Sequence, residues 1–161
     1  MTVDHIYDLL RDVYDPEIPV LNLVELGVVR RVDLVDGAVE VDITPTYSGC
    51  PAMKVMEAEI VAKLREAGVE TIRINTVWSP AWTTDWMSAE THRKLKEYGI
   101  APPGQVAATD LNPRHYGEKK VPCPYCDSED TVLKSQFGST ACKAMYACNS
   151  CRQPFEHFKC I

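Results

Sequence analysis

The sequence predicts an α/β (α+β) protein in which a small α-β-β-α-β-α layer domain precedes a C-terminal zinc ribbon. Helical and strand-like apolar patterns alternate over about the first hundred of the 161 residues. Six of the seven cysteines follow position 122. We therefore expect a layer domain over residues 1–104, a linker rich in Pro, Gly, Ala and Asn over 105–121, and a ribbon over 122–161.

The layer domain is expected to open with a helix over residues 3–14. Thr2 precedes this helix as an N-cap candidate, and Pro16 disfavours helical geometry at the residue before it. The apolar residues of the segment recur at helical spacing: Ile6, Leu9, Leu10 and Val13. After a loop, two β-rich runs flank Asp36-Gly37, a dipeptide typical of type I′ hairpin turns.

The second β-rich run alternates apolar with polar residues, which predicts one buried and one solvent-facing side. Its apolar residues are Val39, Val41 and Ile43, and its polar residues are Glu40, Asp42 and Thr44. A second helix is expected from Pro51 to about Ala67, ended by Gly68. A third strand over residues 69–77 and a short charged helix over 88–98 complete the domain.

All three tryptophans, Trp78, Trp82 and Trp86, lie in the segment WSPAWTTDWM. They recur every four residues, but Pro80 argues against one regular helix through the segment. They either close over the core or form an exposed aromatic surface for a partner. Burial in the core is expected for two of the three.

The composition excludes several classes of protein. Hydrophobic residues make up 45% and charged residues 25%, as in soluble globular proteins. No apolar run approaches the ~18 residues of a membrane span, and the acidic N-terminus does not resemble a signal peptide, so a cytoplasmic protein without membrane contact is expected. Residues 105–161 hold 7 Lys and Arg against 6 Asp and Glu, which disfavours nucleic acid as a partner.

Two C-x2-C pairs predict a metal site in the C-terminal segment. Cys123 and Cys126 form the first pair, Cys148 and Cys151 form the second, and the segment 127–147 separates the pairs. Each tight turn can direct two thiolates at one ion, and two such turns joined by a hairpin complete a tetrahedral site. We expect structural zinc; an iron site of rubredoxin or cluster type is the alternative, because four thiolates do not choose between the metals.

Two further cysteines of this segment, Cys142 and Cys160, have two interpretations. Each is a small packed residue or an incidental thiol, or the two together form a second soft-metal or redox site beside the ribbon. His157 is disfavoured as a substitute ligand, because four cysteines already complete a set.

Cys50 stands alone in the segment TYSGCPAM, far from the nearest other cysteine, Cys123. It lies between an expected strand and a helix opened by Pro51, which makes it an N-cap candidate. A helix N-terminus stabilises a thiolate, the form that binds metals and attacks electrophiles. The alternative is a small buried residue. No general base is identified near it in the sequence, so no catalytic residue is assigned.

Asp15 and Glu17 form the other polar feature, in a loop bracketed by prolines. Two carboxylates at this spacing suit an acid/base pair or a hard-metal site. Residues of this kind more often cap turns and face solvent, and this second interpretation is favoured on physical grounds alone.

Several segments together resemble a known family. DPEIPVLNLVELGVV, TPTYSGCPAM and WSPAWTTDWM are similar to the small domain of SufT-like iron–sulfur assembly factors. The ribbon segment FGSTACKA is similar to that of the PaaD family, which accompanies the phenylacetyl-CoA epoxidase of aerobic phenylacetate degradation. The resemblance covers essentially the whole chain. It implies that Asp15, Pro16 and Glu17 form the family's acidic motif and that Cys50 is its reactive cysteine.

This resemblance implies an accessory factor, not an enzyme, that matures iron–sulfur clusters or metal centres of the epoxidase system. The client implied is the reductase component, which carries flavin and an iron–sulfur cluster. Cys50 would hold iron or a cluster transiently, and Asp15 and Glu17 would shape that site or the client interface. The zinc ribbon would serve as a docking module for the client. Sheet edges could also pair two copies into a homodimer.

The alternative is a subunit of the oxygenase complex that contributes to electron transfer or substrate handling. The sequence contains no Gly-rich nucleotide loop and no Glu-x-x-His pattern of a diiron site, which weighs against a redox or oxygenase role of its own.

Overall fold

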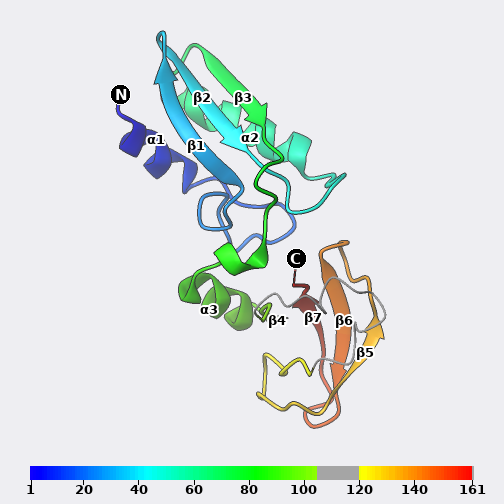
Figure 1. Ribbon diagram of the computed structural model, residues 1–161. Coiled ribbons are helices and arrows are strands. Elements are labelled where there is room, and N and C mark those ends of the chain that lie inside the picture. Colours follow the sequence, from blue (N-terminus) through cyan, green and yellow to red (C-terminus); the bar gives the residue numbers. More distant parts are fainter. Residues whose placement is uncertain (105–119, 161) are drawn as a thin grey trace. The chain divides into compact units, whose positions relative to one another are not determined.

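The protein is described by a computed structural model that covers residues 1–104 and 120–160. The chain forms two compact units, Met1–Trp82 and Thr83–Ile161 (Figure 1). Both helices and sheets are present, so the mixed α+β fold class is confirmed. None of the described helices is long and apolar enough to cross a membrane. Most of the predicted linker, residues 105–119, lies outside the described residues.

The first unit contains a three-stranded sheet and two helices. Its elements are α1 (Val3–Leu10), β1 (Val29–Val35), β2 (Ala38–Ile43), α2 (Met53–Glu66) and β3 (Ile72–Thr76). The strands are ordered β1-β2-β3, with β1 antiparallel and β3 parallel to β2. The helices pack on each other and on the sheet (Figure 1). Fully buried side chains from both layers form the core, among them Ile6, Leu10, Met56, Ile60, Leu64, Val41 and Ile43.

A side-chain cap explains where α1 begins, and a change in the backbone hydrogen-bond pattern explains where it ends. The Thr2 side chain accepts a hydrogen bond from the His5 N–H at 3.3 Å, as predicted for an N-cap. The helix ends at Leu10, four residues before the predicted end. After Leu10 the N–H groups of Asp12 and Val13 bond three residues back instead of four, which tightens and closes the last turn.

The predicted hairpin forms at Asp36-Gly37. Both residues have positive φ, 49° and 78°, as a type I′ turn requires. The second β-rich run departs from its predicted pattern at Asp42 and Thr44, which are both buried. The Asp42 side chain has partners on the neighbouring strands. The Asp42 carboxylate accepts hydrogen bonds from Arg31 Nε at 2.8 Å and Asn75 Nδ2 at 3.0 Å. These bonds from the neighbouring strands replace the hydrogen bonds to water that the carboxylate loses on burial. These partners hold the pKa of Asp42 below its usual value, although burial alone would raise it.

The second helix begins at Met53 and not at Pro51, since Pro51 and Ala52 form a turn before it. Gly68 ends it as predicted, with φ at 85°. The N–H of Gly68 bonds to Arg65 O and the N–H of Val69 bonds to Leu64 O, which together make a Schellman motif. The third strand, β3, lies inside the predicted range of residues 69–77.

The second unit contains a four-stranded sheet preceded by helical segments. Its elements are η1 (Thr84–Trp86), α3 (Ala89–Glu97), β4 (Ile100–Ala101), β5 (Thr131–Ser135), β6 (Lys143–Cys148) and β7 (Pro154–Phe158). The strand order is β4-β7-β6-β5. The sequence did not predict β4 or β7. β4 pairs with β7 within the second unit, which begins at Thr83, whereas the sequence pattern placed a boundary after residue 104.

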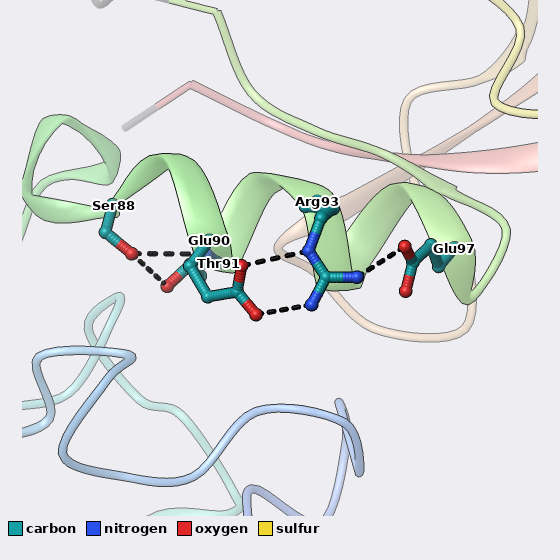
Figure 2. A network of polar contacts seen from close by, with 5 residues as sticks. All are labelled: Ser88, Glu90, Thr91, Arg93 and Glu97. Carbon is teal, nitrogen blue, oxygen red and sulfur yellow. Dashed lines mark hydrogen bonds and ion pairs between the residues drawn. The ribbon is translucent and has the colours of Figure 1, made fainter.

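The predicted short helix is α3, and charged pairs stabilise its surface. Ser88 caps it by accepting a hydrogen bond from the Thr91 N–H at 3.1 Å. Figure 2 shows Arg93 held between Glu90, one turn before it, and Glu97, one turn after it. The hydrogen bonds to Glu90 and Glu97 raise the pKa of Arg93. These groups are exposed and satisfy one another, so the network is a feature of helix stability and not a binding site.

The tryptophans differ in burial. Trp82 is buried and donates a hydrogen bond from Nε1 to Leu26 O at 2.8 Å. Trp86 is half-buried, and Trp78 is 62% exposed. The segment therefore both closes over the core and leaves one aromatic side chain at the surface.

Candidate metal centre and thiol site

The four predicted ligands, Cys123, Cys126, Cys148 and Cys151, converge in the second unit. All four Sγ atoms lie within 4.8 Å of one another. The hairpin of β5 and β6 and the following strand β7 bring the two pairs together, since Cys148 ends β6 and Cys151 lies in the turn to β7. The two C-x2-C turns are thereby held against each other, as the spacing predicted.

The distances fit zinc. Cys123 Sγ lies 3.6 Å from Cys151 Sγ, and Cys126 Sγ lies 3.6 Å from Cys148 Sγ. A tetrahedral ion with Zn–S bonds of about 2.3 Å separates its sulfurs by roughly 3.8 Å. A disulfide would need about 2.05 Å. The four thiols are therefore arranged for a shared ion and not for disulfides.

The two turns have matching backbone geometry. The residue after each second cysteine, Asp127 and Arg152, has positive φ, 61° and 64°. In each turn the N–H of the first cysteine bonds to the carbonyl five residues later, that of Ser128 or Gln153, at 2.9 Å. Neither left-handed residue is glycine; aspartate is enriched in this conformation, whereas arginine gives no such signal.

Electrostatics show why this group needs a cation. The N–H of Cys151 donates to the Cys148 sulfur at 3.4 Å, and with further donors it lowers the pKa of Cys148 to about 6. The Gln153 N–H favours a thiolate at Cys151, but burial and the neighbouring thiols raise its pKa to about 12. One thiolate thus forms easily and disfavours the next, until a cation neutralises them.

The remaining thiols of the second unit lie outside this group. Cys142 is buried, with its sulfur 3.1 Å from Thr140 Oγ1. Cys160 is half-buried, and its sulfur lies 3.6 Å from Gly104 O. His157 is buried, with Nδ1 3.1 Å from Ala101 O, so β7 holds it against β4. Within the described residues these three groups form no cluster of three or more metal ligands.

Cys50 lies in the loop between β2 and α2 and is half-buried. The prediction that Cys50 caps the helix is wrong, because the N-cap is Ala52, whose side chain cannot accept a hydrogen bond. The helix begins two residues later than expected, which displaces the thiol from the cap position. Gly49 has φ at 77°, so the preceding turn requires glycine.

The environment of Cys50 also reverses the predicted direction of its pKa. Burial raises the pKa above its ordinary value of 9.0, and the charges of Glu17 and Asp15 raise it further. The Ala52 N–H and the Tyr47 hydroxyl act in the opposite direction without overcoming these effects. The thiol is therefore protonated at neutral pH.

The acidic pair is electrostatically coupled to Cys50, although the two lie far apart in the sequence. Asp15 is 5% exposed, and its Oδ1 accepts hydrogen bonds from the N–H groups of Glu17 at 2.7 Å and Ile18 at 2.9 Å. Asp15 therefore shapes the loop, as a turn-capping residue does, but it is buried instead of facing solvent. Glu17 is half-buried. Its charge acts on the thiol more strongly than that of Asp15.

A second set of polar side-chain hydrogen bonds stabilises the same loop. Asn22 Oδ1 accepts hydrogen bonds from the N–H groups of Val24 and Glu25, and Glu25 Oε1 accepts one from the Asn22 N–H at 2.9 Å. This reciprocal arrangement is that of a capping box. This turn was not predicted, although the spacing Asn-x-x-Glu is a signal that identifies such turns.

Cys50, Asp15 and Glu17 do not form a complete metal site. Among the described residues, the four cysteines of the ribbon are the one group of three or more potential ligands whose donor atoms converge. Cys50 can supply one sulfur ligand in a negatively charged surrounding.

Comparison with known proteins matches both halves of the chain. Residues 4–75 match the family "Iron-sulfur cluster assembly protein", and residues 108–159 match the "PaaD zinc beta ribbon domain". A protein of Escherichia coli (strain K12) that is named as a subunit of 1,2-phenylacetyl-CoA epoxidase is 45% identical over 99% of this chain and 93% of its own length.

Other relatives match the first part of the chain. A Porphyromonas gingivalis Fe-S protein maturation auxiliary factor is 38% identical, over 58% of this chain and 90% of its own. The crystal structure of a domain of unknown function, DUF59, from Bacillus anthracis has a TM-score of 0.54 at 28% identity, covering 58% of this chain and 90% of that one.

The converging cysteines and the thiol loop thus lie in the two regions that the families cover. The chain belongs to the iron–sulfur cluster assembly and maturation family, in the group that carries a PaaD zinc beta ribbon.

Proposed function

We propose that this protein is an accessory factor that matures the iron–sulfur cluster of the reductase component of a phenylacetyl-CoA epoxidase. Cys50 holds iron or a cluster transiently, and Asp15 and Glu17 favour its cationic cargo. The observation that carries the proposal is that the half-buried thiol of Cys50 lies in the region that matches the iron–sulfur cluster assembly family, where the charges of Glu17 and Asp15 act on it.

The chemistry of this site suits the transfer of an iron ion or cluster more than its storage. A protonated thiol beside two carboxylates attracts a cation and releases a proton when its sulfur binds it. Because the three donor groups do not converge into a closed site, the protein supplies few of the ligands that iron prefers. An ion or cluster held by one thiolate can pass to a client that supplies the others.

The ribbon has a structural role in this proposal. Cys123, Cys126, Cys148 and Cys151 would hold zinc, which ties β5, β6 and β7 into one module. The apolar cluster of this module is small, so a bound ion would supply much of its stability. The module would then act as a docking element for the epoxidase components.

The test is the cluster content of the reductase produced with variants of this protein. With Cys50→Ser we expect the reductase to lose most of its iron and acid-labile sulfide, while the variant itself stays folded because the loop bonds use backbone atoms of residue 50. Cys160→Ser is the matched control, a half-buried thiol in the other unit, and should leave loading unchanged. A reductase with a full complement of iron and sulfide, produced with Cys50→Ser, would contradict the proposal.

A second candidate is a subunit of the epoxidase complex, which the name of the Escherichia coli relative favours. Epoxidase activity reconstituted from purified components that already carry their cofactors separates the two functions. The maturation role predicts full activity without this protein. A stoichiometric requirement for it would establish the subunit role instead.

A further inference from the structure

A groove of about 460 Å³ lies between the chain that follows α1 and the C-terminal half of α2. Pro16, Pro19 and Ala62 contribute to its lining. Its volume lies within the range of about 300–1,000 Å³ typical of ligand sites. The groove is shallow and open to solvent, which suits a segment of polypeptide better than a small molecule that must be enclosed.

The charges around the groove are unbalanced. Lys63 is paired with Asp12 at 2.8 Å, so its charge is already compensated. Glu59 and Glu66 also line the groove and are exposed; the charge of Glu66 acts on Lys63, but within the part of the chain that the structure describes neither glutamate forms an ion pair. The unit as a whole, residues 1–82, has 7 Lys and Arg against 14 Asp and Glu, a net charge of −7. A positively charged occupant complements this surface.

The spacing of the two glutamates specifies the occupant further. They are seven residues apart on α2, so they share one face and stand about 10 Å apart along its axis. A polyproline II segment has three residues per turn and rises about 3.1 Å per residue. Its residues i and i+3 therefore lie on one side, about 9 Å apart, and the residues between them face elsewhere.

We propose that this groove docks a segment of the client protein in which two Lys or Arg residues flank two apolar residues. The cations would meet Glu59 and Glu66 on α2, and an apolar side chain between them, which faces another direction, would pack on Pro16 and Pro19 of the chain that follows α1. The inference rests on the proposed function for the identity of the partner as a client. Asp15 also lines the groove, so a docked segment would lie beside a residue coupled to Cys50.

Binding of a fluorescein-labelled peptide that contains Lys-Pro-Leu-Lys tests this directly by fluorescence anisotropy. We expect saturable binding to the full chain that weakens with added salt, and no binding of the matched Glu-Pro-Leu-Glu peptide. Glu59→Lys combined with Glu66→Lys should weaken binding about tenfold or more, because two attractions become repulsions. Ala62→Trp places a large side chain in the groove and should abolish peptide binding.

Glu70→Lys is the control, because Glu70 is exposed on the same unit but does not line the groove. Equal weakening of peptide binding by Glu70→Lys, or equal affinity for the two peptides, would overturn the proposal. Binding would then reflect only the net negative charge of the unit. A dimer in sedimentation experiments that Ala62→Trp disrupts and the peptide does not would assign the groove to a second copy. The peptide assay needs no metal transfer, so it holds even if the role of Cys50 fails.

Discussion

At the scale of single residues, the environment of Cys50 decides its chemistry. Sequence position alone favours a thiolate at a helix start, but the folded loop half-buries the thiol away from the cap, where the charges of Glu17 and Asp15 also raise its pKa. Its raised pKa keeps it protonated until a cation or a more electropositive partner arrives. Asp15 has two roles at once, because its hydrogen bonds shape the loop while its charge acts on the thiol.

Glu17→Gln should speed the alkylation of Cys50. Glu17 raises the thiol pKa, so removing its charge lowers the pKa and increases the thiolate fraction at every pH below it. We expect faster reaction with iodoacetamide at pH 8, measured by mass spectrometry of the peptide that contains Cys50 in zinc-loaded protein. Glu70→Gln serves as the control. An unchanged or slower rate for Glu17→Gln would contradict the coupling.

At the scale of elements, local bonding sets where helices begin and end. The cap at Thr2, the cap at Ser88 and the Schellman motif at Gly68 all follow from residue types visible in the sequence. The starts and ends that differ from prediction, at Leu10 and Met53, depend on competing turns that flanking residues make.

Gly68→Ala should destabilise the first unit by about 1 kcal/mol. Its φ of 85° is strained for alanine, whereas the added Cβ meets nothing within 4 Å, so the cost is that of backbone conformation alone. Urea denaturation followed by circular dichroism measures the change. Gly68→Asn should cost less, because asparagine tolerates this region better. Equal stability of Gly68→Ala and the wild type would show that the motif relaxes without strain.

At the scale of the whole molecule, the protein is two units with separate cores and separate sources of stability. The first contains an apolar core of two helices and a sheet, whereas the second gathers a small apolar cluster around four thiols. The separation is consistent with the proposed roles, in which the first unit would handle cargo and the second would stay folded around a permanent ion.

Removal of zinc should unfold the ribbon and spare the first unit. Chelation at neutral pH leaves four closely spaced thiols that cannot all ionise, so the metal-free ribbon loses its main cross-link. Hydrogen exchange should then show lost protection over residues 121–158 and retained protection over residues 3–76. Uniform loss in both regions, or retention in both, would contradict independent stability.

The sequence by itself determined which four cysteines converge in the ribbon, the hairpin at Asp36-Gly37, the N-cap at Thr2 and the helix end at Gly68. Each depends on residues close together in the chain, whose chemistry and spacing restrict the local backbone. The same holds for the order of elements in the first unit, which hydrophobic periodicity indicates.

Only the tertiary structure decided the pairing of β4 with β7, the burial of Asp42 and the direction of the Cys50 pKa. β4 has two residues and no pattern of its own, and it becomes a strand because a distant segment lies beside it. Cys50 is coupled to carboxylates that are remote from it in the sequence, and electrostatic effects depend on distance in space and on burial, which residue order does not contain.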